Sequence, residues 1–186
     1  MKAVEKMLNG VDIVGLVDTI NAIKKDSTIA DFKFRAENQW IDGALNRSHI
    51  SGFYGAKQED TSRAKPFVFD NDEPPVLLGE NRGANPVEYL LHGLAGCLTT
   101  TFVYHAAARG IRLNSVKSRL EGDIDLHKLL GIDETKRAGY QQIRVTFEVD
   151  SPAPREVIED LIKFTGTHSP VADSVANPVD VVVRLA

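Results

Sequence analysis

The spacing of apolar residues changes along the first third of the chain. Over 11–25, valines and isoleucines recur every three or four positions with Asp and Lys between them, which predicts an amphipathic helix. Over 32–40, apolar and polar positions alternate, which predicts a strand. Gly43 marks a turn, and a second strand is expected over 47–53. The polar stretch 55–66 is typical of a loop.

The most apolar segment lies in the middle of the chain. Residues 89–108 include no Asp, Glu, Lys or Arg, and a helix of that length could span a bilayer. The two glycines, two histidines and three threonines of this segment make insertion unfavourable, so a helix buried inside a soluble fold is expected instead. Asn85 as the cap, followed by Pro86 and Glu88, predicts where this helix begins. Gly110 predicts where it ends.

Alternating patterns also occur in the rest of the chain. Further strands are expected at 66–69, 76–79, 111–126, 143–149 and 179–185. The polar stretch 127–139 would connect two of these strands, and a second helix is expected to open at 151–154 and to close at Gly166. The segment 168–178 is broken by prolines. Runs of strands between two long helices favour an α+β fold over a wound parallel sheet.

Length and charge restrict the class of protein. The 186 residues suit one domain over 31–186, with residues 1–30 as an N-terminal helical extension. The net charge of −4 and pI near 5.7 argue against a nucleic-acid binder. A single cysteine excludes an intramolecular disulfide, and the N-terminus lacks the features of a signal peptide, so a cytoplasmic protein is expected. The five histidines show no metal-type spacing and no phosphate-binding glycine motif occurs, so neither a metal nor a cofactor is expected.

The only thiol, Cys97, lies in the middle of the apolar helix, beside Gly93 and Gly96. Glycine lowers helix propensity, so these two positions indicate close approach of another helix or of a ligand. A lone cysteine on such a helix is usually an inert core residue, and a reactive thiol is the other interpretation. Because Cys97 is far from a helix N-terminus, a reactive thiolate would need a nearby cation. Arginine suits this role because it stays charged when desolvated.

A resemblance to a known family rests on the stretch NPVEYLLHGLAGC, the helix, antiparallel pair and second helix that follow it, and the HSPV turn. These features, from about residue 32 to the C-terminus, resemble the OsmC/Ohr family of thiol-dependent hydroperoxide reductases. The resemblance implies an OsmC-like fold, in which antiparallel sheets wrap around long central helices in an intertwined homodimer with the site at the interface. It implies that Cys97 is the peroxidatic cysteine and that Arg47 is the best match to the family arginine. Without the resemblance, its surroundings favour the interpretation of Arg47 as a solvated turn residue.

Two positions depart from the family pattern. The family carboxylate that pairs with the arginine lies where this sequence has Val87, and the neighbouring Glu88 lies on the helix face opposite to Cys97. Glu88 therefore either reaches the site of a partner chain or serves in the helix cap. The family's resolving Cys-Pro is here Ser169-Pro170, and serine cannot form a disulfide. If the alignment holds, Ser169 lies close to Cys97; otherwise it only caps the turn that follows.

Two functions follow from these residues. The first is a stress-response thiol peroxidase of the one-cysteine type, which reduces a small organic hydroperoxide and is restored by an external thiol. Its catalytic residues would be Cys97 as nucleophile, Arg47 as the stabilising cation and Glu88 as the carboxylate. The apolar residues expected to select an organic peroxide are Leu94, Leu98 and Phe102. The second function is non-catalytic binding of a small apolar ligand, with Cys97 as lining; a catalytic thiol must be reachable, whereas an inert one is buried among aliphatic side chains.

Overall fold

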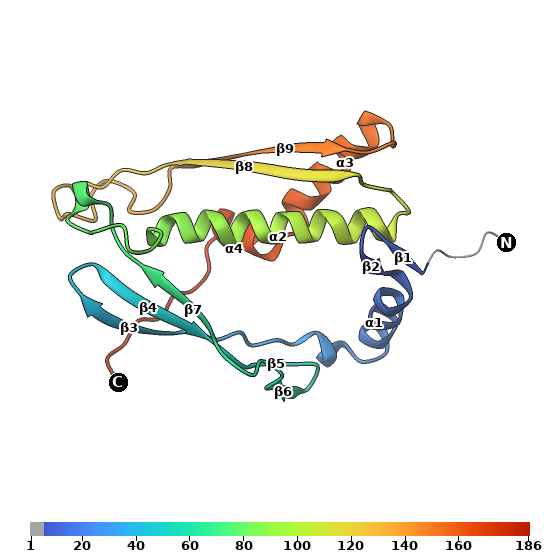
Figure 1. Cartoon of the computed structure of the whole chain (residues 1–186), viewed down its shortest axis with the longest axis horizontal. Coiled ribbons are helices and arrows are strands. Elements are labelled where there is room, and N and C mark those ends of the chain that lie inside the picture. The colour runs from blue at the N-terminus through green and yellow to red at the C-terminus, as the bar shows by residue number, and fades with distance from the viewer. Residues whose placement is uncertain (1–5) are drawn as a thin grey trace. The chain divides into compact units, whose positions relative to one another are not determined.

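The computed structural model describes residues 6–186 (Figure 1). The chain forms two compact units, one of residues 14–90 and one that combines the residues up to 13 with residues 91–186. The first five residues of the expected 1–30 extension lie outside the described part. The division into this extension and a domain over 31–186 stays a prediction.

A long helix and a long hairpin dominate the unit of residues 91–186 (Figure 1). The helix α2 (Pro86–Ala108) begins in the other unit and runs into this one. Strands β8 (Ser115–Asp123) and β9 (Gln142–Asp150) pair antiparallel along their whole length. Exposed and half-buried residues alternate along both strands, as expected when one face of a hairpin packs on a core. Two helices follow, α3 (Arg155–His168) and α4 (Pro170–Ala176).

The hydrophobic core of this unit lies between α2, α3 and the hairpin. The buried residues of α2 recur every fourth position, so they form one stripe; they include Leu94, Leu98, Phe102 and Ala106. The ring of Phe102 is fully buried and stacks on Phe147 of β9, with 5.7 Å between ring centroids. Leu161 of α3 is fully buried in the same cluster. These contacts attach both helices to the hairpin.

The N-terminal residues 6–13 join the same unit through one asparagine. Strands β1 (Met7–Leu8) and β2 (Val11–Asp12) form a two-residue hairpin. In the turn between them, the side-chain amide of Asn9 donates to the carbonyl of Ile111 at 2.8 Å, and its oxygen accepts from the N–H of Leu113 at 2.9 Å. Asn9 thereby satisfies backbone groups that follow the end of α2.

The unit of residues 14–90 is built around a small antiparallel sheet. Its strands, in spatial order, are β3 (Glu37–Asp42), β4 (Leu45–Ile50) and β7 (Phe67–Asn71). A separate hairpin pairs β5 (Phe53–Gly55) with β6 (Gln58–Asp60). The helical elements are α1 (Ile13–Lys25), which starts at the unit boundary, and the 3₁₀ helices η1 (Ser27–Ala30) and η2 (Pro75–Leu77). The sheet carries Arg47, and the segment after β7 leads into α2.

The predicted fold class is confirmed, because the chain combines helices with antiparallel sheets. The helices expected over 11–25 and from Asn85 to Gly110 are present, and the backbone of Gly110 has the positive φ of 71° that a glycine C-cap adopts. In the part of the chain that the structure describes, no helix is both long and apolar enough to cross a membrane.

Two local predictions before α2 are wrong. The strand expected over 76–79 is instead the 3₁₀ helix η2. Proline at the first position of η2 presets a helical φ, and Leu78 then takes a left-handed conformation with φ of 67°, which interrupts extended backbone. The loop expected over 55–66 contains strand β6.

Two predictions near the C-terminus are also wrong. The segment 168–178 contains helix α4, because a serine cap followed by proline is a helix start as well as a break. Residues 179–185, expected as a strand, form neither helix nor strand in the described single chain. A strand requires a neighbouring edge to pair with, and sequence pattern alone does not supply one.

Helices α2 and α3 meet at an aromatic contact that contains two histidines. The ring of His105 lies edge-on to Phe164 with centroids 4.6 Å apart, and His168 stacks on the same ring at 3.5 Å. The guanidinium of Arg109 lies 4.4 Å from the Phe164 centroid. Burial lowers the pKa of His105, and the positive charges of Arg109 and His168 lower it further. The neutral imidazole of His105 therefore suits this contact.

This contact predicts a loss of stability at mildly acidic pH. Because the pKa of His105 is lower in the folded chain, the unfolded chain binds a proton first as the pH falls below about 6.5, and the free energy of unfolding decreases. Thermal unfolding between pH 7.5 and pH 5.5 should show this decrease, and His105→Gln should reduce it. An equal pH dependence in wild type and variant would contradict the assignment.

Candidate active site

Cys97 lies at the border between the buried and the exposed faces of α2. Leu94 and Leu98 are buried, whereas Gly96 is exposed and the free thiol of Cys97 is half-buried. Apart from their chain neighbours and the backbone of α2 itself, no atom lies within 4 Å of the position that a Cβ would take at Gly93 or Gly96. The helix surface beside the thiol is therefore open in the single chain. Leu94 and Leu98, which were expected to select the substrate, do not lie on this open surface. They belong to the buried stripe of α2.

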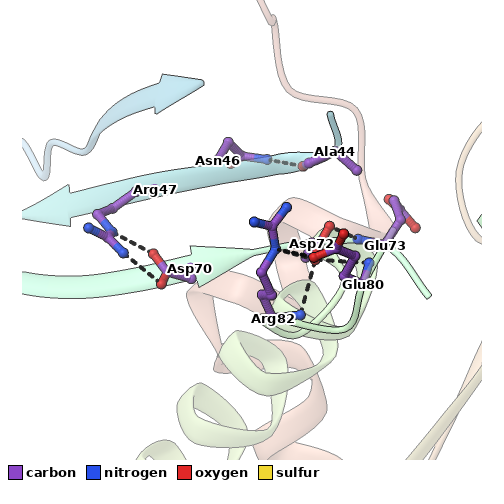
Figure 2. Close-up of polar contacts among 8 residues, drawn as sticks. All are labelled: Ala44, Asn46, Arg47, Asp70, Asp72, Glu73, Glu80 and Arg82. Atoms are coloured by element: carbon purple, nitrogen blue, oxygen red, sulfur yellow. Dashed lines mark hydrogen bonds and ion pairs between the residues drawn. The ribbon is translucent and has the colours of Figure 1, made fainter. Parts of the chain in front are cut away.

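Arg47 is a strand residue whose guanidinium is held by a carboxylate. In the sheet it is the register partner of Asp70 on β7. Its Nε donates to one carboxylate oxygen of Asp70 at 2.6 Å and its Nη2 donates to the other at 2.9 Å (Figure 2). The pairing lowers the pKa of Asp70 and raises that of Arg47, so both groups stay charged. The interpretation of Arg47 as a turn residue is wrong, because it lies within β4.

The Arg47–Asp70 ion pair and the first turns of α2 lie on opposite faces of the sheet. Successive strand side chains alternate between faces, so Asp70 and its neighbour Phe69 point to opposite sides. The ring of Phe69 packs edge-on against Tyr89 of α2, with centroids 6.0 Å apart. The Tyr89 hydroxyl donates to the backbone carbonyl of Asp70 at 3.0 Å. Strand β7 therefore orients Arg47 on one face and anchors the first turns of α2 on the other.

A buried aspartate shapes the segment between β7 and α2. The side chain of Asp72 is fully buried, and its carboxylate accepts from the backbone N–H groups of Glu73, Glu80 and Arg82 at 2.9–3.1 Å (Figure 2). The Arg82 guanidinium adds a fourth contact at 3.4 Å. The backbone N–H of Arg82 contributes most to lowering the pKa of Asp72. The ionised carboxylate thereby fixes the turn that delivers the chain to α2.

The predicted capping box at the start of α2 is present. The side-chain oxygen of Asn85 accepts from the N–H of Val87 at 2.8 Å, and the Glu88 carboxylate accepts from the N–H of Asn85 at 2.9 Å. The Asn85 side-chain amide also donates to the carboxylate of Glu73. These bonds satisfy donors that the first turn of a helix leaves free. The Glu88 carboxylate thus has a capping role in the single chain.

Comparison with known proteins identifies the family. Residues 79–184, more than half of the chain, match the family described as OsmC-like protein. The chain belongs to this family. Its structure is similar to that of an OsmC-like protein from Mycoplasma pneumoniae, with 19% identity, a TM-score of 0.58, and coverage of 77% of this chain and 87% of that one. It is also similar to an organic hydroperoxide resistance protein OsmC from Legionella pneumophila, with 17% identity, a TM-score of 0.51, and coverage of 77% and 88%.

At these identities, the structural similarity establishes a shared OsmC-like fold. Among curated protein sequences, none matches this chain.

Ser169, which stands where the resemblance places a second cysteine, has a structural role in this OsmC-like chain. Its side chain is fully buried, and its hydroxyl oxygen accepts from the N–H of Ala172 at 3.3 Å. Its own N–H donates to the carbonyl of Thr165 at 3.1 Å. Ser169 therefore ends α3 and caps α4, and its expected proximity to Cys97 stays a prediction.

The predicted site residues are divided between the two units. Arg47 and Glu88 lie in the unit of residues 14–90, and Cys97 lies in the other unit. The carboxylate paired with Arg47 is Asp70, a residue that sequence reasoning missed. The two strands were expected, but their register is a tertiary property, and only the register places Asp70 opposite Arg47. Within residues 6–186, no group of three or more His, Cys, Asp or Glu side chains is arranged to hold a metal ion.

Proposed function

We propose that this OsmC-like protein reduces small organic hydroperoxides, with Cys97 as the reactive thiol. The observation that carries the proposal is that Cys97 is only partly buried and lies beside the open helix surface at Gly93 and Gly96. A thiol that serves only as core packing would be buried among aliphatic side chains. The description of the Legionella pneumophila structure as an organic hydroperoxide resistance protein supports the same class of substrate for this chain.

The oxidising step is a two-electron transfer from sulfur to the peroxide. The Cys97 thiolate attacks the terminal peroxide oxygen, an S–O bond forms and the O–O bond breaks. The alkoxide that leaves takes up one proton and becomes an alcohol, and the sulfur becomes sulfenic acid. We assign to Arg47 the stabilisation of the thiolate and of the charge that develops on the leaving oxygen. Its bidentate pairing with Asp70 keeps the guanidinium in a defined orientation.

The reducing step requires an external thiol, because the chain has a single cysteine. One thiolate attacks the sulfenic sulfur of Cys97, an S–S bond forms and the S–O bond breaks, and the hydroxide that leaves takes up a proton and becomes water. A second thiol attacks the mixed disulfide and frees Cys97, so two equivalents are oxidised to a disulfide per turnover. This cycle suits a reducing compartment, and we place the protein in the cytoplasm.

The rate at which Cys97 is oxidised tests this function. Reduced protein is mixed with cumene hydroperoxide at pH 7.4, the sulfenic acid is trapped with dimedone, and the rate is compared with that of free cysteine, with Cys97→Ser as the blank. We expect a rate at least about 100-fold above free cysteine, as positioned charge stabilisation provides. A rate equal to that of free cysteine would sink the enzymatic proposal in favour of non-catalytic binding of a small apolar ligand.

We propose that Glu88 contributes its charge to the site of a partner chain in addition to its capping role. Glu88→Gln removes the charge and keeps an oxygen that can accept from the N–H of Asn85. We expect the peroxide rate of Cys97 to fall about tenfold, as for loss of one charge-assisted contact, with an unchanged unfolding midpoint. An unchanged rate in this variant would limit Glu88 to the helix cap. As a control, Asn85→Ala should lower stability by about 1 kcal/mol.

We propose that the active form is an intertwined homodimer. Large apolar side chains around β3 are exposed in the single chain, with Phe34 70% and Trp40 69% accessible. In the C-terminal segment, Val183 and Leu185 are 90% and 98% accessible. Apolar surface of this kind usually marks an interface. A second copy offers the pairing edge that the predicted strand over 179–185 lacks in one chain.

Sedimentation tests the assembly. At micromolar concentration we expect a particle of twice the 20.4 kDa chain mass, held by an interface of the large, hydrophobic class. Removal of residues 179–186 should weaken the dimer, because the added strand and its valines are lost. A stable monomer of the full chain would refute the proposal.

A further inference from the structure

The connection between β8 and β9 lines a hollow, open to solvent, that the proposed peroxide chemistry does not use. Its volume is about 410 Å³, within the range of about 300–1,000 Å³ that is usual for small-molecule sites. The residues that line it include the apolar Leu126, Leu130 and Ile132 and the polar Asp125, His127 and Gln141. Apolar walls with a few polar groups are typical of a binding site for a small organic molecule.

The connection holds its shape through its own backbone hydrogen bonds. The N–H of Leu130 donates to the carbonyl of Leu126 at 3.0 Å, and the N–H of Ile132 donates to that of His127 at 2.8 Å. Gly131 lies between these bonds with a φ of 67°, a left-handed conformation that glycine adopts without strain. The apolar walls of the hollow are therefore placed by a hydrogen-bonded turn.

Asp125 orients the ring of His127 at the hollow. One carboxylate oxygen of Asp125 lies 2.5 Å from Nδ1 of His127 and accepts from the backbone N–H of the same residue at 2.9 Å. These contacts lower the pKa of Asp125, the backbone bond first, so the carboxylate is ionised and can only accept. A proton on Nδ1 satisfies this carboxylate, so the contact favours the tautomer in which Nε2 is the acceptor. Within the described residues, Nε2 has no hydrogen-bond partner.

We propose that this hollow binds a small aliphatic alcohol. The hydroxyl donates to Nε2 of His127 and accepts from the side-chain amide of Gln141, and the alkyl chain lies against Leu130 and Ile132. A neutral donor fits better than an anionic head group, because the ionised Asp125 lines the same hollow. Burial of the alkyl chain supplies the favourable free energy and the hydroxyl contact supplies the selectivity.

Nuclear magnetic resonance titration of the isotope-labelled full chain with 1-hexanol tests this site. We expect saturable shifts confined to residues 124–141. The isomer 1-methoxypentane has the same atoms but no hydroxyl to donate, and should bind about tenfold more weakly. His127→Phe keeps an aromatic ring, removes Nε2 and should weaken 1-hexanol binding by a similar factor. Leu130→Asp should abolish binding, because it places a charge in the apolar wall.

The control is His49→Phe, which changes a histidine of β4 in the other unit and should leave the affinity unchanged. Three results would overturn the proposal: absence of saturable shifts over 124–141, equal affinity for the alcohol and its ether isomer, or shifts centred on residues 93–101. The last would assign the alcohol to the thiol site. None of these results bears on the rate at which Cys97 reacts with peroxide, so the two proposals are tested separately.

Discussion

Replacing Arg47 by alanine is expected to slow the oxidation of Cys97 by cumene hydroperoxide about 100-fold, the usual effect of losing one donor to a developing oxyanion. Alkylation of the thiol by iodoacetamide at neutral pH should slow as well, because the thiolate loses its counter-charge. Stopped-flow measurement of both reactions checks the prediction. The two rates separate the roles: alkylation reports on the thiolate alone, whereas peroxide reduction also reports on the leaving oxygen.

Two further variants make this test specific. Arg144 is a matched control, since its guanidinium is also held by two carboxylate groups, those of Asp123 and Glu121, and Arg144→Ala should change neither rate. Asp70→Asn keeps Arg47 but weakens the bidentate pairing. We therefore expect the rate of Cys97 oxidation to fall less than in Arg47→Ala. Equal rates in wild type and Arg47→Ala would assign the Arg47–Asp70 pair to the sheet alone and would end its proposed role at the thiol.

Replacing Phe102 by alanine is expected to lower the free energy of unfolding by about 3–5 kcal/mol. The ring is fully buried and stacks on Phe147, so its removal loses apolar burial and leaves a cavity between α2 and β9. For a chain of this length, that loss corresponds to a fall of roughly 10 °C in the unfolding midpoint. Calorimetry at a fixed protein concentration measures it, since association also contributes to stability.

The matched control is an exposed apolar residue outside the core. Leu129 is 67% accessible, and Leu129→Ala should change stability by less than about 0.5 kcal/mol. Each single alanine variant of Phe102 or Phe147 already loses the contact between the two rings. The free energy of unfolding lost in the double variant should therefore be about 0.5–1.5 kcal/mol smaller than the sum of the two single losses. Full additivity would mean that the stacked rings make no specific contribution.

Local chemistry made much of the fold predictable. The capping box of Asn85 and Glu88 starts α2, and Gly110 ends it; these signals depend on residues within one or two helical turns. The alternation along β8 and β9 likewise follows from residues adjacent in sequence. The same local chemistry misled at Pro170, where a proline taken as a break is the first residue of α4.

The candidate site was predictable only in part. Cys97 stands out in the sequence as the only thiol, in a segment free of charged residues. Its half-buried position depends on which face of α2 packs on the hairpin, and that is a property of the packed core. Asp70 carried no signal of its own, because one carboxylate just after the strand predicted over 66–69 gives no indication of which residue it will oppose.

The longer helices and most strands could be located from the sequence, because caps, turns and hydrophobic period act over a few residues, and the sequence also shows that Cys97 is the one thiol available. Only the packed fold sets the partner of Arg47, the capping role of Ser169, the burial of Leu94 and Leu98, and the lack of pairing over 179–185. These properties depend on register and on contacts between distant segments. The free energy that selects them comes from burial and pairing across the fold, which no local pattern encodes.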